Sequence, residues 1–386
     1  MKKLPGAARS LKMDTKILRM SQFLGYFPIP VANNTSSTFL KKYVPIVLSL
    51  LFILFGFCNI VIFIWHARLD HVHYRAPESS QLLSSETFYF SLLLKGTVHI
   101  VTIVFVRLTI FSSRDELSLF YDEFNSLLEQ FSQFSPTSEN TTDETKFVSV
   151  SIRNRFESRL RIEFTAIVLL CLAFIVDMWE GHSSIPASAS FSLFHAVIPS
   201  TLGYIQVIFP FQLAFFLNWY LEILSSLSTP PFTMLETRLK LYSLLSEHVY
   251  SFIRLFGTCL VIDMAHSITR IIICAYSVAS FVSEPFPNMR GLLSDFFTVL
   301  VYLYLVFMIC KKGSQLEIAS GDFIKGYENA GKLCGVDHFS RSNPRLSRIW
   351  LDTDYFRVNL GLIPPIVGTL LTNLIVLIQF QRADKT

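Results

Sequence analysis

Seven apolar stretches, each close to the length needed to cross a bilayer, run through this chain of 386 residues. A hydrocarbon core about 30 Å thick requires roughly 20 apolar residues in helical conformation. The first stretch contains no charged residue, and the others contain few. The predicted spans are 44–65, 87–111, 162–179, 191–224, 257–282, 292–310 and 355–380. The sequence therefore predicts an all-α membrane protein with seven transmembrane helices.

The composition supports this fold class and excludes several others. Hydrophobic residues make up 51% of the chain and charged residues 16%, whereas soluble domains carry about 25% charged residues. This balance excludes an ordinary cytosolic enzyme and a disordered chain. The sequence has no phosphate-binding glycine loop, no H-E-x-x-H and no nucleophile elbow, and the pair His71 and His73 lacks further ligands. We expect no enzymatic activity, cofactor, metal site or nucleic-acid partner.

The distribution of basic residues predicts the orientation in the membrane. If the N-terminus is cytoplasmic, the inside segments carry 24 Lys and Arg residues and the outside segments carry 5. Loops rich in Lys and Arg remain in the cytoplasm. We therefore expect a cytoplasmic N-terminus and an extracellular C-terminus, which is opposite to the orientation of a G-protein-coupled receptor.

This topology divides the chain into five predicted parts. They are a cytoplasmic N-terminal segment (1–43), a ligand-binding bundle of the first six spans with their long cytoplasmic loops (44–312), a cytoplasmic anchor segment (313–354), a seventh helix (355–380) and an extracellular tail (381–386).

Three cytoplasmic segments show helical periodicity. Apolar residues recur at three- and four-residue spacing from Arg114 to Phe134, which predicts an amphipathic helix continuing the second span. Segments 232–256 and 313–340 have the same spacing. The sequence predicts a packed helical anchor region below the membrane, with helices lying on the inner leaflet as the alternative.

Ionisable residues within spans are costly and therefore informative. Lys95 and His99 are one helical turn apart on the second span, and a pocket role and a structural hydrogen bond are equally supported. Asp263 and Arg270 share a face of the fifth span, which favours structural pairing. Arg107 lies near the inner boundary, and we expect its side chain to snorkel.

The last span contains two features that affect a helix. Pro364 and Pro365 each lack a backbone N–H, which predicts a helix split into a cytoplasmic piece ending near Gly361 and an outer piece from about Ile366. The outer piece carries a stripe at helical spacing, formed by Thr369, Thr372, Val376 and Gln379 with Ile375 beside them. Such a stripe predicts contact with water or with partner helices rather than lipid.

Two segments resemble the insect gustatory receptor family. The run Thr372-Asn373-Leu-Ile-Val-Leu-Ile-Gln379-Phe380 resembles the family signature T-Y-(five hydrophobics)-Q-F, with Asn373 in place of tyrosine. Residues 24–28 (LGYFP) resemble the L-G-x-x-P segment that precedes the first span in that family. Leu374 stands where the sugar-receptor branch carries glutamate. The chain resembles a divergent member of this family, within the insect chemosensory receptor superfamily.

The resemblance implies a homotetrameric, ligand-gated, non-selective cation channel. It implies that the outer piece of the last span lines a central pore and that the ligand pocket lies between the second and sixth spans. Carried over by motif position, Gln379 and Phe380 form the pore gate. The pore-lining positions implied are Thr369, Thr372, Ile375 and Val376.

The resemblance also sets expectations for ligand and partners. Candidate ligand-binding residues in the outer halves of the spans are Tyr89, Lys95, His99, Trp179, Tyr204 and Tyr276. We expect a small-molecule tastant of unknown class, permeant cations, membrane lipid, and identical or related subunits as partners. The expected location is the plasma membrane of sensory neurons.

The alternative function is a seven-transmembrane G-protein-coupled chemoreceptor, which requires an extracellular N-terminus. Asn33 and Asn140 begin N-x-[ST] sequons that are both cytoplasmic in the orientation predicted above. We predict that both remain unmodified when the protein is expressed in cells, as measured by the mobility shift on endoglycosidase treatment. Glycan on Asn33 would reverse the orientation and favour the G-protein-coupled alternative.

Overall fold

The computed structural model describes residues 18–29, 43–58, 61, 86–134, 165, 168–169, 205–228, 235–282, 289–333 and 347–383. The named helices are α3 (Glu86–Ser112), α4 (Arg114–Phe134), α8 (Ile208–Ser228), α9 (Leu235–Val282), α10 (Met289–Leu333), the short 3₁₀ helix η3 (Leu360–Leu362) and α11 (Ile363–Ala383). Residues 18–23 and Tyr43–Cys58 are also helical. The all-α prediction is confirmed for these residues.

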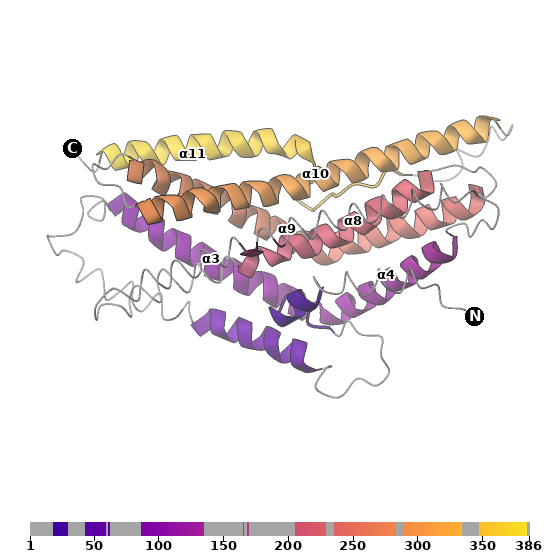
Figure 1. Cartoon of the computed structure of the whole chain (residues 1–386), viewed down its shortest axis with the longest axis horizontal. Helices are drawn as coiled ribbons and strands as arrows, with labels where there is room; N and C mark the ends of the chain where they lie inside the picture. Colours follow the sequence, from indigo (N-terminus) through magenta and orange to yellow (C-terminus); the bar gives the residue numbers. More distant parts are fainter. Residues whose placement is uncertain are drawn as a thin grey trace.

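Two long helices, α9 and α10, form the centre of the molecule. They pack against each other, and α8 packs along both (Figure 1). α3, α4 and α11 each contact α9, and α11 also contacts α3. The 48 residues of α9 extend for about 72 Å, more than twice the hydrocarbon thickness. The predicted spans 257–282 and 292–310 are therefore parts of longer helices, which extend into the predicted helical segments 232–256 and 313–340.

The number of spans is supported in part. Within the described residues, four helices are long and apolar enough to cross a membrane, and the α3–α4 pair brings the number to five. Tyr43–Cys58 is a shorter apolar helix at the first predicted span. The third predicted span, 162–179, lies almost wholly outside the described residues, so the number seven and the orientation remain predictions.

The amphipathic helix α4 follows α3 as predicted, but the junction between them is bent. The two helices meet at Ser113 with a bend of 70°. Backbone hydrogen bonds continue across it, from Ser113 N to Thr109 O (3.1 Å) and from Leu117 N to Ser113 O (2.8 Å). The bend lets the apolar face of α4 pack against α9, so Leu117 is buried. Burial of this face favours a bend that the local sequence does not indicate.

Aromatic side chains from α4, α8 and α9 form a cluster in the core. Phe120 and Phe124 of α4 both meet Phe216 of α8 edge to face, with ring centroids 5.2 Å apart. Tyr220 of α8 meets Phe252 of α9 in the same way at 5.8 Å. Edge-to-face pairs add to the stabilisation from burial. The cluster therefore joins α4 and the first part of α9, which are predicted to be cytoplasmic, to the part of α8 that lies in the predicted span 191–224.

A histidine fixes the polar contacts of this cluster. His248 lies on α9 before the predicted span 257–282, and burial lowers its pKa to about 4. Its Nε2 lies 3.1 Å from the Phe120 carbonyl, which can only accept, so Nε2 donates. Nδ1 then accepts from the Tyr220 hydroxyl at 2.8 Å. The neutral ring thus satisfies a backbone group of α4 and a side chain of α8 together.

The aromatic cluster predicts a large effect of truncation on stability. We expect Phe216→Ala to lower the free energy of unfolding by about 3–5 kcal/mol, because it leaves a cavity among packed rings. Phe23→Ala is the matched control, since Phe23 is 66% exposed. Thermal unfolding of the purified protein measures both variants. Equal effects of the two substitutions would contradict the assigned core.

Candidate functional site

α11 starts at the two prolines instead of being interrupted by them. Pro364 and Pro365 occupy the second and third positions of α11. Proline is tolerated in a first helical turn because its missing N–H has no intrahelical partner there. The predicted cytoplasmic helical piece before the prolines is wrong, since residues 355–359 are not helical. Asn359 instead caps η3 by accepting from Gly361 N at 3.0 Å.

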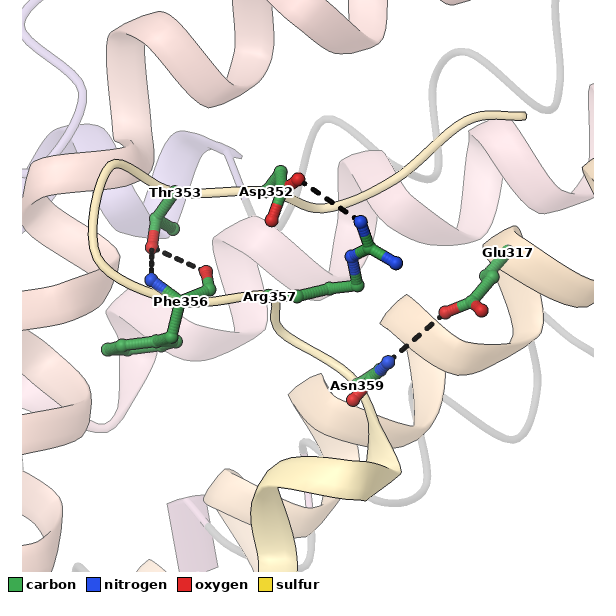
Figure 2. A network of polar contacts seen from close by, with 6 residues as sticks. All are labelled: Glu317, Asp352, Thr353, Phe356, Arg357 and Asn359. Carbon is green, nitrogen blue, oxygen red and sulfur yellow. Dashed lines mark hydrogen bonds and ion pairs between the residues drawn. The ribbon is translucent and has the colours of Figure 1, made fainter. Parts of the chain in front are cut away.

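The segment before α11, residues 347–359, forms a hairpin that we call the strap. A backbone bridge pairs Asp352 with Arg357, and their side chains form an ion pair at 3.4 Å (Figure 2). At the turn, the Thr353 hydroxyl donates to Phe356 O (2.7 Å) and accepts from Phe356 N (3.1 Å). The Arg357 guanidinium also lies over the Trp350 ring at 3.7 Å. These contacts give the strap a defined shape.

The strap is attached to α9 and α10. Asn359 Nδ2 donates to Glu317 Oε2 of α10 at 3.2 Å (Figure 2). Leu360 N donates to the Ser314 hydroxyl at 2.8 Å, and Tyr242 of α9 donates to Ser347 O at 2.8 Å. Val358 is fully buried. The base of α11 is therefore held by the two longest helices.

Most of α11 is uncovered in the single chain. Only 6% of its most apolar window is buried, against 72% for α8. Leu371, Ile375 and Phe380 are each more than half exposed. An apolar surface of this extent requires cover by lipid or by other protein. α11 thus presents a face that the rest of the chain does not complete.

The polar stripe lies on the uncovered part of α11. Thr369, Thr372, Asn373 and Gln379 are all exposed. The hydroxyls of Thr369 and Thr372 donate to Pro365 O (3.0 Å) and Gly368 O (2.9 Å). Since the hydroxyl hydrogens are used within the helix, their oxygens remain available as acceptors. Such a face suits water or a cation better than it suits lipid.

The opposite side of α11 packs on the bundle. Ile366 is buried and Leu370 joins the main core. Farther along, Leu374, Leu377 and Ile378 pack on Tyr276 of α9, which is fully buried. Tyr276, a candidate ligand residue, is thus a contact between α9 and the pore-helix candidate.

The described part of the structure does not place the remaining candidate ligand residues next to one another. His99 of α3 is buried, and its Nδ1 lies 2.6 Å from His266 Nε2 of α9, which joins these two helices. Tyr89 and Lys95 lie on α3, but their side chains fall outside the described part. Trp179 and Tyr204 lie outside it entirely.

A buried polar chain beside the bundle was missed by sequence reasoning. Arg107 does not snorkel: it is fully buried, its guanidinium stacks on Tyr26 at 4.0 Å, and its Nε donates to Leu24 O at 3.2 Å. Tyr26 donates to Gln206, whose amide donates to Asp263 at 2.8 Å. Asp263 is thus hydrogen-bonded to α8's leading segment. The LGYFP resemblance was the signal that residues 24–28 matter.

Comparison with known proteins supports the fold. No protein-family model matches the chain, and no curated protein matches it significantly. The chain is similar to the insect olfactory receptor OR5 from Machilis hrabei in complex with eugenol, with a TM-score of 0.58 and 12% identity over 95% of this chain and 98% of the receptor. A second structure of that receptor gives a TM-score of 0.61 and 11% identity over 97% and 99%.

This similarity extends over nearly the whole of both chains. The protein therefore shares the fold of this insect olfactory receptor. The fold expected from the sequence resemblance is thus confirmed, at a sequence identity of only 11–12%. The apolar helices and the fold together define a multi-pass membrane protein.

The contact between Tyr276 and α11 predicts a stability effect. We expect Tyr276→Ala to lower the free energy of unfolding by about 3 kcal/mol or more, because it removes a buried ring that α11 packs on. Tyr250→Ala is the matched control on the same helix, since Tyr250 is 70% exposed and should change stability by less than about 0.5 kcal/mol. Thermal unfolding measures both, and an unaffected Tyr276 variant would refute the contact.

Proposed function

We propose that this protein is a gustatory-type chemosensory receptor that acts as a ligand-gated, non-selective cation channel. The observation that carries the proposal is α11, an apolar helix whose uncovered face bears a polar stripe. The fold shared with insect olfactory receptors supports a chemosensory channel. That fold favours neither an enzyme nor a G-protein-coupled receptor. The plasma membrane of sensory neurons is the proposed location.

The proposed pore forms where α11 helices from four copies, or from related subunits, meet at an axis. Thr369, Thr372, Ile375 and Val376 line it in this arrangement. The acceptor oxygens of the threonines suit a passing cation, while the aliphatic positions keep the pore narrow. Assembly also buries apolar surface of α11 that is exposed in the single chain. One arrangement thus accounts for both the apolar and the polar parts of the helix.

The proposed gate lies at the end of the stripe. Phe380 is 58% exposed in the single chain, and four such rings at an axis form a constriction that excludes water. Gln379 beside it offers an amide oxygen. Neighbouring helical residues point about 100° apart, so a rotation of α11 by that order exchanges the ring for the amide at the axis. This exchange provides a closed and an open state without a large movement of the bundle.

The ligand acts by favouring the open state. A small molecule shifts the gate only if it binds that arrangement more tightly than the closed one. We place the ligand among the spans next to α3 and α9, the helices that carry His99 and Tyr276. Since Tyr276 contacts α11, a shift of α9 reaches the pore helix directly. Tyr89, Lys95, Trp179 and Tyr204 remain candidates for the same pocket.

The gate is tested by removing the ring. We predict that Phe380→Ala raises the unliganded current several-fold at equal surface expression, because the constriction no longer excludes water. Whole-cell recording in expressing cells measures the current. Leu371→Ala is the control, since Leu371 is also exposed but lies roughly 180° around the helix from Phe380. Closed-state current and gating that match the unmodified protein would count against the gate.

A further inference from the structure

The strap lies close to the backbone of α10 at a glycine, Gly313. A Cβ placed on Gly313 of α10 would lie 1.9 Å from the Val358 carbonyl oxygen and 3.2 Å from Leu351 Cδ1. Both neighbours belong to the strap. Val358 O is a backbone atom and cannot rotate out of the way as a side chain can. The strap therefore rests directly on the backbone of α10.

The strap cannot yield at Val358 alone. Val358 N donates to Leu351 O at 2.8 Å, and both residues are buried. On one side Ile349 N donates to the Ser320 hydroxyl at 3.1 Å, and on the other Leu360 N donates to the Ser314 hydroxyl at 2.8 Å. A displacement of Val358 breaks these bonds or carries the strap with it. The contact at Gly313 therefore sets the position of the whole hairpin.

The displacement that any side chain would force is large for a packed site. An ordinary carbon–oxygen contact is about 3.3 Å, so Val358 O must withdraw from α10 by about 1.4 Å. Val358 lies two residues before η3, which leads directly into α11, and Asn359 caps η3. Two prolines restrict the backbone immediately beyond. The base of α11 consequently moves with the strap.

We propose that Gly313 is a positioning residue for the gate, through the backbone contact that sets where α11 stands relative to α10. This inference rests on the function proposed above. In a closed pore, four Phe380 rings must converge at one axis. If the base of each α11 moves by more than an ångström, the four rings no longer meet at the axis. A side chain at position 313 is therefore expected to make the closed state leak.

The test compares two glycines of the same helix. Gly326 lies on α10 as well, with nothing within 4 Å of an added Cβ. Gly313→Ala and Gly326→Ala are introduced separately into the full-length protein. We expect Gly313→Ala to raise the unliganded current per surface-expressed channel several-fold and Gly326→Ala to leave it unchanged. Equal currents in the two variants, or a lower current in Gly313→Ala, overturn the proposal.

A general loss of stability is separated from this effect by a third variant. Phe124→Leu perturbs the aromatic cluster of α4, so it should lower the unfolding temperature without changing the current per channel. If Gly313→Ala does not reach the cell surface, Ser314→Ala replaces it, because it removes the bond to Leu360 N without adding bulk. A leak in Ser314→Ala supports the proposal, and an unchanged current overturns it.

A second measurement does not depend on ion conduction. Hydrogen exchange of the purified full-length protein reports on the amides of Leu351–Leu360, several of which are bonded within the strap or to α10. We expect Gly313→Ala to accelerate their exchange several-fold and Gly326→Ala to leave it unchanged. If the unmodified protein conducts no ions, the proposed function fails. The docking role of Gly313 is then decided by exchange alone, and unaltered exchange overturns it.

Discussion

Apolar surface must be removed from water, and in this fold that requirement is met very unevenly. α8 is enclosed by its neighbours, whereas α11 is almost bare although its composition is that of a membrane helix. Lipid would cover its leucine and valine side chains, but lipid offers nothing to Thr369, Thr372 and Gln379. The proposed axis shared between copies would cover the apolar positions and hydrate the polar ones. The proposed assembly follows from this incomplete burial of α11.

The same helix is held very differently along its length. Its base is fixed by the strap, by the cap at Asn359 and by Ile366 in the core. Its outer part meets the bundle at Tyr276 and is otherwise exposed over much of its surface. A helix fixed at one end and lightly packed at the other can move at the lightly packed end at small cost. The proposed gate at Phe380 lies at that end.

Pattern and composition were sufficient for the helical class, for the amphipathic helix at 114–134 and for the stripe on the last helix, because these depend on local periodicity. They were insufficient where residues far apart in the sequence determine the local structure. Arg107 is buried because Tyr26, far away in the sequence, supplies an aromatic face. The helix bends at Ser113 because the apolar face of α4 packs against α9. The proline pair begins a helix because the strap before it finds its bonds on α10. No local signal marks Gly313 as a contact.

The most direct test is imaging of the full-length protein in lipid nanodiscs by single-particle electron microscopy. We predict several copies around one axis, with Thr369 and Thr372 of every α11 directed toward it and the Phe380 rings at its narrowest point. A single copy whose α11 presents those side chains to acyl chains would contradict the account.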